Sequence, residues 1–318
     1  MRRHLVFVVV GLAVLGVAQE VPPGVDAASF ARIGIGGWPL ALGGAYVALA
    51  EGPTAGYWNP AGLAYLQGFA AEGMYTNWLG AGIHYQHLGV AGYPPLGEER
   101  PVLRLGETEL TFALNWLSVM VPDIPWIEEG GAAGTFTAWS HLFLLSVGFP
   151  WGEGGALGAT LKVYHDRILE GVSLGMGLDL GVLWETTLAG QKLRLGLVTT
   201  DVGSSRIQWY GTTGEPVNFV PWLIRAGAAL LLWEERLVLA MAAERGVDRP
   251  RFERVRLGAG MRVEFLSLGV GWDQPLYGES GRWSAGLRIT PLDWLTLEYA
   301  FLPAPLGDSH WLSLRLAF

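Results

Sequence analysis

Few side chains in this 318-residue sequence have the types and spacing that catalysis or metal binding requires. His84 and His87 are three residues apart, and on a strand this odd spacing places them on opposite faces, where they do not share a metal. Asp308, Ser309 and His310 have the residue types of a hydrolytic triad, but consecutive loop residues lack its geometry. The sequence has no cysteine, which excludes thiolate ligands and disulfides. We therefore expect no enzyme, no metal site and no cofactor.

Charged residues instead occur at alternate positions within apolar segments. If these segments are strands, one face carries isolated charges among Gly, Ser and Thr, and the other face is apolar. Such enclosed charges form either a self-neutralising ladder that holds an internal segment or a conduit wall that pairs with the head group of an amphiphile. The predicted interior charges are Lys162, Asp179, Arg194, Arg225, Arg254, Arg256, Arg262, Glu264, Arg288, Glu298 and Arg315.

Period-two alternation extends over most of the chain from residue 68 onward. In the segment 282–290, Trp283, Ala285, Leu287 and Ile289 alternate with Arg, Ser and Gly. The segment 311–318 alternates in the same way and ends on the aromatic Phe318. A helix would scatter these residues around its circumference, so the pattern predicts strands.

Composition separates a membrane barrel from a soluble β-protein and from other classes. Hydrophobic residues make up 51% and charged residues 16% of the chain, with 46 Gly and 15 Trp. A net charge of −8 argues against nucleic-acid binding, and the low charge content argues against disorder. Beyond the extreme N-terminus, no apolar run is long enough for a membrane helix. The interface-type aromatics near predicted strand ends favour a transmembrane barrel; they are Trp151, Trp184, Trp222, Trp233, Trp272, Trp294 and Trp311.

Fourteen strand segments are predicted, and counts from twelve to sixteen fit the pattern. Bacterial single-chain barrels have even numbers of strands, with short connections on one side and long connections on the other. Short links occur at 150–155, 187–191, 233–235, 266 and 290–293, and long links at 121–137, 202–218, 246–251, 273–281 and 302–308. The first hairpin reverses this order, since its link at 77–80 is short and the following link at 93–106 is long.

The N-terminal part of the chain reads differently. A basic start, an apolar stretch to Val17 and small residues before Gln19 predict a cleaved signal peptide at residues 1–18. Residues 19–67 do not alternate, and their small-residue pieces fit short helices. This segment is either a periplasmic leader or a plug inside the barrel formed by residues 68–318. The expected fold is an all-β antiparallel transmembrane barrel with an N-terminal hatch.

Two motifs resemble the FadL-like outer-membrane proteins, with the PorV/PorQ family as the closest branch. The first runs from Gly43 to Ala50 and continues through Trp58 into Asn59-Pro60-Ala61-Gly62-Leu63; the second is the segment 306–316. The resemblance implies a fourteen-stranded barrel whose hatch carries Asn59, Pro60, Ala61 and Gly62 in a gating role. It also makes Phe318 part of the C-terminal signal for barrel assembly.

Two functions follow from the resemblance, and a structural barrel without a transport role is a third possibility. The first is an outer-membrane channel for small hydrophobic compounds, and the alternative is a PorV-like shuttle component of type IX secretion that holds secreted cargo. The expected partners are outer-membrane lipids, the barrel assembly machinery, and either hydrophobic small molecules or secreted cargo. The negative net charge argues against nucleic acid as a partner.

Overall fold

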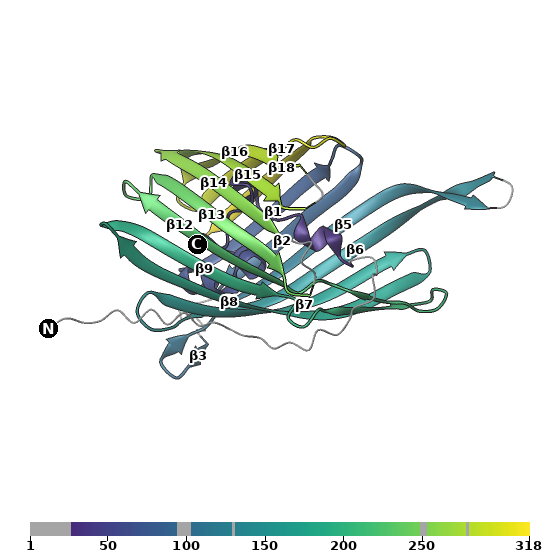
Figure 1. Ribbon diagram of the computed structural model, residues 1–318, viewed down its shortest axis with the longest axis horizontal. Coiled ribbons are helices and arrows are strands. Elements are labelled where there is room, and N and C mark those ends of the chain that lie inside the picture. The colour runs from purple at the N-terminus through teal and green to yellow at the C-terminus, as the bar shows by residue number, and fades with distance from the viewer. Residues whose placement is uncertain (1–26, 94–102, 129–130, 249–252, 278–279) are drawn as a thin grey trace.

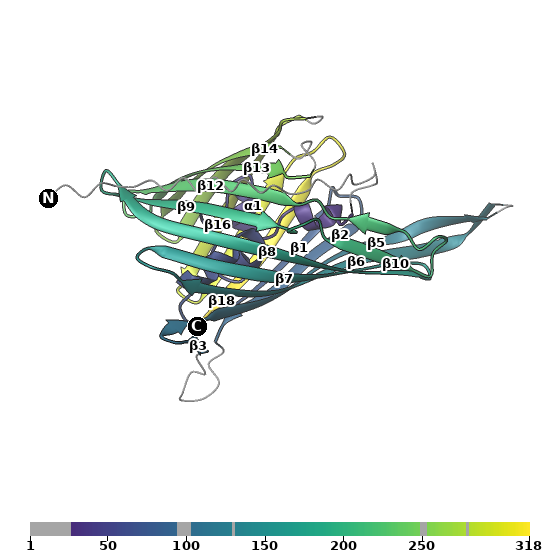
Figure 2. The ribbon, with the colours of Figure 1, turned by 60° about the horizontal axis from the view of Figure 1, so that its bottom comes forward.

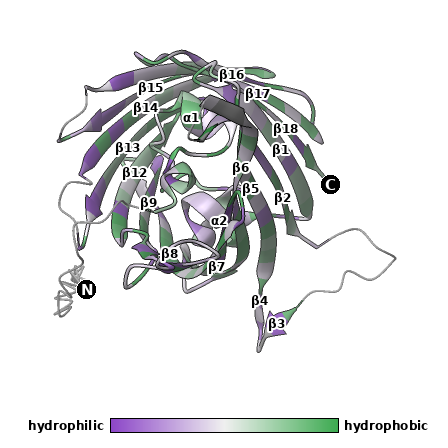
Figure 3. Cartoon of the chain, turned by 90° about the vertical axis from the view of Figure 1, so that its right-hand side faces the viewer, coloured by the Kyte–Doolittle hydropathy of each residue, from purple (hydrophilic) through white to green (hydrophobic). Residues whose placement is uncertain are grey.

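The computed structural model describes residues 27–93, 103–128, 131–248, 253–277 and 280–318. These residues form a closed antiparallel ring of strands with short helical segments inside it (Figures 1 and 3). The predicted signal peptide, residues 1–18, lies outside the described residues. Within the part of the chain that is described, no helix has the length and apolar character needed to cross a bilayer.

The ring contains fourteen strands. The first strand, β1, pairs with the last strand, β18, and the pairing of β8 with β9 completes the ring. Phe318 takes part in the first closure, because its backbone N–H and C=O both bond to Phe69. The predicted strand number and the all-antiparallel arrangement are thus confirmed. The ring strands are β1 (Phe69–Trp78), β2 (Ile83–Gly92), β5 (Thr111–Glu128), β6 (Gly131–Pro150), β7 (Gly155–Ile168), β8 (Gly171–Leu188), β9 (Gln191–Thr200), β12 (Leu223–Leu232), β13 (Leu237–Gly246), β14 (Arg254–Val263), β15 (Leu266–Pro275), β16 (Arg282–Leu292), β17 (Leu295–Leu302) and β18 (Ser309–Ala317).

Shorter elements accompany the ring. Four helical turns lie N-terminal to the first strand: η1 (Ser29–Arg32), α1 (Gly37–Ala41), α2 (Ala55–Trp58) and η2 (Pro60–Tyr65). A small hairpin of β3 (Arg104–Leu105) and β4 (Thr108–Glu109) sits in the long connection after β2, so the reversed order of the first two links is real. The strands β10 (Arg206–Tyr210) and β11 (Val217–Phe219) extend the sheet from the first half of β8.

One predicted loop is wrong. The segment 121–137 was expected to be a long link, but β5 and β6 continue through it as a paired ribbon that projects beyond the ring (Figure 1). A register shift between Val121 and Ile124 bulges the ribbon at Asp123, which has a φ of 55°. The bulge absorbs residues that do not fit a regular ladder, so pairing resumes beyond it.

Alternation along the strands separates the outer face from the inner face. In β8 the leucines Leu174, Leu178 and Leu180 are exposed, whereas Gly177 and Asp179 between them are buried inside the ring. The eleven residues from Leu174 to Trp184 span about 25 Å along the barrel axis at the usual strand rise and a tilt near 40°. An apolar outer band of this height is the surface that a transmembrane barrel presents to lipid.

Aromatic side chains border this band at both ends of the strands. Exposed rings at the end that carries the C-terminus are Trp151, Trp184, Trp233, Trp294 and Phe318, and those at the far end include Tyr75, Trp272 and Trp283. The prediction is wrong for Trp311, which is fully buried inside the ring with its indole edge-on to Tyr85 at 5.1 Å between ring centroids. Its position in β18 has inward parity, and this parity rather than nearness to a strand end decides its environment.

Candidate functional site

Residues 27–67, called the hatch from here on, lie inside the ring (Figure 3). On one side, α1 contacts β15, β16, β17 and β18, and on the other side α2 and η2 contact β5, β6 and β7. Val47 packs against β9, β12 and β13. Tyr85 of β2 donates its hydroxyl to the carbonyls of Phe30 and Gly34 at 3.1 Å. With Met74 of β1, Val182 of β8 and Leu42 against β14, the hatch touches every strand of the ring.

The small residues on the inner face of the strands give the hatch its clearance. At Gly158 an added Cβ would lie 2.3 Å from the carbonyl carbon of Pro60, and at Gly271 it would lie 2.0 Å from the amide nitrogen of Gly43. Real Cβ atoms do not approach other atoms so closely, so a side chain at either position would displace the hatch. The wall glycines with this role are Gly148, Gly158, Gly181, Gly196, Gly258, Gly260, Gly269, Gly271 and Gly286.

Asn59 fixes the Asn59-Pro60-Ala61-Gly62 element to the wall. Its side-chain amide donates to the carbonyl of Val47 in the hatch at 3.1 Å and to the carbonyl of Val182 in β8 at 3.0 Å. Its oxygen accepts from the backbone N–H of Ala61 at 3.2 Å and so caps η2. Asn59, Pro60, Ala61 and Gly62 are all buried. The motif therefore joins two parts of the hatch to one strand of the barrel.

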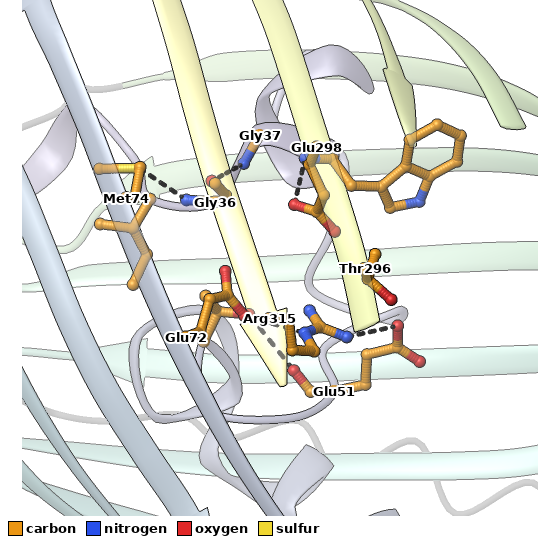
Figure 4. A network of polar contacts seen from close by, with 12 residues as sticks. Gly36, Gly37, Glu51, Glu72, Met74, Thr296, Glu298 and Arg315 are labelled. Atoms are coloured by element: carbon orange, nitrogen blue, oxygen red, sulfur yellow. Dashed lines mark hydrogen bonds and ion pairs between the residues drawn. The ribbon is translucent and has the colours of Figure 1, made fainter. Parts of the chain in front are cut away.

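A second set of polar contacts holds α1 against the opposite wall (Figure 4). The backbone N–H groups at the start of α1 donate to the wall, from Gly37 to the Ser313 hydroxyl and from Trp38 to the Glu298 carboxylate, both at 2.8 Å. Just before the helix, Gly36 donates to the Met74 sulfur at 3.0 Å. These wall side chains satisfy N–H groups that a helix start leaves without intrahelical partners.

Glu51 links the same wall to the middle of the hatch. Its carboxylate lies 3.4 Å from both Arg288 and Arg315, while Arg288 also pairs with Glu298 at 2.9 Å and Arg315 with Glu72 at 3.0 Å (Figure 4). Burial of the Glu51 carboxyl favours its neutral form, but the guanidinium groups of Arg288 and Arg315 outweigh burial and lower the pKa of Glu51. Glu51 is therefore held as an anion between two cations.

A third cluster lies where the sheet divides between β9 and β10. Lys162 pairs with Asp179 at 2.8 Å and with Asp201 at 2.9 Å, and all three are buried. Asp201 also accepts from the hydroxyls of Tyr164 at 2.7 Å and Ser205 at 2.8 Å. The cluster ties the bend after β9 to β7 and β8, and so closes the wall at the point where β8 changes its pairing partner.

Between the hatch and the wall lies a cavity of about 380 Å³. The strand ends that line it lie on the side of the ring opposite the C-terminus, as Figure 2 shows for the strands. Its floor includes Arg32, Tyr57 and Trp58 of the hatch, and its wall comes from the far ends of β12 to β18 and β1. The size is within the range of small-molecule pockets. This cavity is the candidate functional site, with the hatch beneath it as the barrier to passage.

Most predicted interior charges lie where the alternation places them. Lys162, Asp179, Arg194, Arg225, Arg254, Arg256, Arg288, Glu298 and Arg315 are buried or half-buried inside the ring. Arg262 keeps the inward parity of β14 but lies exposed at the edge of the ring. Glu264 does not line the lumen: β14 ends at Val263, and Glu264 occupies the following turn at a φ of 54° and is exposed. The alternation stops at the turn, so parity no longer places the side chain.

Several interior residues were absent from the predicted set. Glu51 and Arg32 belong to the hatch, where no period-two pattern exists to assign a face. Glu244 and Asp273 lie near the ends of β13 and β15. The links begin close by, so the alternation did not decide which face of the strand these side chains take. Arg282 lies on the inward face of the alternating segment 282–290, so the period-two pattern contained the signal that places it in the cavity.

The histidine and triad-like residues are separated as expected. His84 faces outward and bonds the hydroxyl of Tyr75 at 2.7 Å, whereas His87 is buried inside and bonds Asn115 at 2.8 Å. Ser309 faces inward and accepts from the Leu79 N–H, while His310 faces outward against Tyr299. In the part of the chain that is described, no three potential metal ligands lie together.

Comparison with known proteins finds the same barrel fold in solved structures. No family model matches the chain, and no curated protein does. Among solved structures, the P. putida toluene transporter TodX matches with a TM-score of 0.57 at 13% identity, over 90% of this chain and 99% of that chain. The Ralstonia pickettii toluene transporter TbuX matches with a TM-score of 0.53 at 12% identity, over 90% and 98%. The chain thus shares the barrel fold of these two proteins.

Proposed function

We propose that this protein is an outer-membrane channel that admits small hydrophobic compounds, with the hatch as its gate. The observation that carries the proposal is a hatch that touches every strand of a closed ring beneath a cavity of about 380 Å³. TodX and TbuX are toluene transporters, and the shared barrel fold is consistent with a related task here. No observation favours the alternative role as a secretion component.

Passage would begin at the cavity and end with displacement of part of the hatch. The hatch consists of turns only four to six residues long, held by side-chain hydrogen bonds and by the fit against wall glycines. Individual bonds of this kind contribute about 1 kcal/mol each, so a local shift is far cheaper than unfolding the ring. We place the gate at Asn59 to Gly62, because this element alone connects η2, the segment at Val47 and β8.

A reversible covalent lock tests the proposal. A Cβ at Gly227 would lie 3.2 Å from the Cβ of Val47, so a small outward shift of either residue reaches the Cβ spacing of a disulfide, about 3.5–4.5 Å. The natural sequence has no cysteine to interfere. The double variant Val47→Cys with Gly227→Cys would be produced in a Gram-negative host, and entry of the hydrophobic dye N-phenyl-1-naphthylamine would be followed by fluorescence.

The expected result is dye entry in cells with the wild-type protein and in the reduced variant, and loss of entry on oxidation. The reduced variant is the matched control for the two substitutions. Dye entry equal to that of cells without the protein would refute the channel. Equal entry in the oxidised and reduced states would refute the hatch as its gate.

A further inference from the structure

The outer face of the ring has a groove where the first and last strands meet. The groove has a volume of about 560 Å³ and is lined by residues of β1, β16, β17 and β18. Its floor lies at Gly73, which pairs with Leu88 of β2 on one side and with Leu314 of β18 on the other. Within 4 Å, a Cβ added at Gly73 would meet only the side chain of Leu88, at 3.3 Å. One absent side chain therefore interrupts the outer row of leucines and leaves the groove open to the outside.

The outward side chains along the groove are apolar. Leu297, Leu312 and Leu314 are exposed and line it. Glu298 and Ser313 also border it, but their side chains are buried inside the ring, where they accept from backbone N–H groups of the hatch. Among the described residues of the lining, no charged side chain therefore points outward. Such a surface, on the face that meets lipid, fits a hydrocarbon chain.

Two identical polar pairs stand on either side of this groove. Tyr75 of β1 and Tyr299 of β17 both pair with Leu312 of β18, one across each ladder. Neighbouring strands are about 4.8 Å apart, so the two tyrosine backbones are about 10 Å apart across the groove. Each tyrosine hydroxyl forms a hydrogen bond of 2.7 Å with the Nδ1 of a histidine, Tyr75 with His84 and Tyr299 with His310.

Each Tyr–His pair keeps a donor for an outside acceptor. An imidazole has at least one N–H, and a tyrosine has one O–H. Whichever group donates within the pair, one of these hydrogens makes the bond and at least one remains. An apolar groove with a donor on each side matches an amphiphile whose acceptor oxygens lie at one end of a hydrocarbon chain.

The pairs lie at the level where lipid head groups are expected. Tyr75 belongs to the aromatic border at the far end of the apolar band. On the other side, His310 packs against Phe301 at 5.2 Å, and Phe301 against Trp283 at 5.6 Å, between ring centroids. Tyrosine and tryptophan are enriched at the membrane–water interface. The floor at Gly73 therefore faces hydrocarbon, and the two pairs face the head groups.

We propose that the groove binds a phosphate-bearing membrane lipid, with an acyl chain over Gly73 and Leu314 and the phosphate between the two Tyr–His pairs. Donors bind the charged oxygens of a phosphate more strongly than neutral ester carbonyls. The phosphate would connect the β1–β2 pair to the β17–β18 pair, and the lipid would brace the joint between the first and last strands. The site lies outside the ring, so the inference goes beyond the proposed channel function and does not depend on it.

The test compares three probes by native mass spectrometry of the detergent-solubilised full chain. Dioleoyl phosphatidylglycerol has two chains and a phosphate, dioleoylglycerol has the same chains without the phosphate, and glycerol 3-phosphate has the phosphate without the chains. Phosphatidylglycerol is expected to bind at least about tenfold more tightly than dioleoylglycerol, as a charged hydrogen bond allows, and glycerol 3-phosphate is expected not to bind. Phosphatidylglycerol should also raise the unfolding temperature, because a ligand of the folded state stabilises it.

One variant and its control test the groove. Gly73→Leu fills the groove and should abolish the preference for phosphatidylglycerol, since only the mobile end of Leu88 has to shift. Ala226→Leu adds a leucine at an exposed outward position of β12, on the opposite wall of the ring, and should bind as the wild type does.

A second variant and its control test the polar pairs. Tyr299→Phe with His310→Leu removes one pair and should weaken phosphatidylglycerol binding by about tenfold while leaving dioleoylglycerol binding unchanged. Trp116→Phe with His141→Leu removes another hydrogen-bonded ring pair, from β5 and β6, and should have no effect. Heat-dependent mobility in detergent gels would show which variants form barrels. If Gly73→Leu does not, the Tyr299 and His310 variant decides.

Four results would overturn the inference. The first is equal binding of phosphatidylglycerol and dioleoylglycerol to the wild type, and the second is unchanged phosphatidylglycerol binding in a folded Gly73→Leu barrel. The third is a loss in either control as large as in its matched variant. The fourth is a lipid-free wild-type dimer that Gly73→Leu converts to a monomer, because a second copy would then occupy the groove.

Discussion

Replacing Asn59 by alanine is expected to release the hatch without unfolding the barrel. The substitution removes three hydrogen bonds, to Val47, Val182 and Ala61, at 3.1, 3.0 and 3.2 Å. A buried hydrogen bond contributes about 1 kcal/mol net, so the docked hatch should lose about 3 kcal/mol. At about 1.4 kcal/mol per factor of ten, the population of undocked hatch should rise roughly a hundredfold.

Asn59→Asp should act in the same direction and more strongly. A carboxylate keeps the oxygen that caps η2 but replaces the donor amide with a second oxygen. That oxygen would face the carbonyls of Val47 and Val182, so two hydrogen bonds would become two repulsive contacts. The order of hatch release should therefore be wild type, Asn59→Ala, Asn59→Asp.

Single-channel recording in planar lipid bilayers measures this release as the fraction of time spent conducting. Asn77→Ala is the matched control, because Asn77 bonds the N–H of Gly82 in an exposed turn away from the hatch. Heat-dependent mobility in detergent gels would show that each variant forms a barrel. If a folded Asn59→Ala barrel conducts no more often than Asn77→Ala, the reasoning that Asn59 holds the gate is refuted.

Three further outcomes follow from the same structure. Gly181→Ala should reduce the free energy of unfolding in denaturant by at least about 1–3 kcal/mol, because the new Cβ would lie 2.1 Å from the Asn59 oxygen; unchanged stability would argue against tight seating. Leu178→Arg on the lipid face should cost about 2–4 kcal/mol in refolding titrations into liposomes, and a neutral effect would place this face away from lipid. The pKa of Glu51 is lowered in the folded protein, so its contribution to hatch docking is present above its ordinary value near 4.5 and is lost as pH falls through the lower folded value. Bilayer conductance should therefore increase in strong acid for the wild type, and Glu51→Gln should lack this step.

The alternation within each segment was sufficient to predict the strands, because one face of each strand lies inside the ring and the other face lies outside it. In β8, Leu174 to Leu180 alternate with Gly175 to Asp179, and this period of two requires no knowledge of the partner strands. The same parity placed nine of the eleven predicted charges inside the ring. It failed at Glu264, where the strand had ended, and it was set aside at Trp311, whose nearness to a strand end suggested an interface position.

Contacts between distant segments were decided by the tertiary structure. Nothing local distinguishes Gly158 from a flexible residue, yet its hydrogen side chain makes room for Pro60. The ribbon formed by β5 and β6 reads as a loop because its bulge interrupts the alternation, and only pairing between the strands keeps it extended.

The amino-acid order alone therefore determined the alternating strands and which of their side chains face outward, since both depend on neighbours within a few residues. Closure of the ring decided how the hatch fits against the wall glycines and which groups Asn59 bonds. It also decided which residues line the cavity. Closure brings Arg32 of the hatch to the same cavity as Arg254 and Arg282, more than 200 residues later. Charge balance in such a space is a property of the folded ring and has no signature in any one segment.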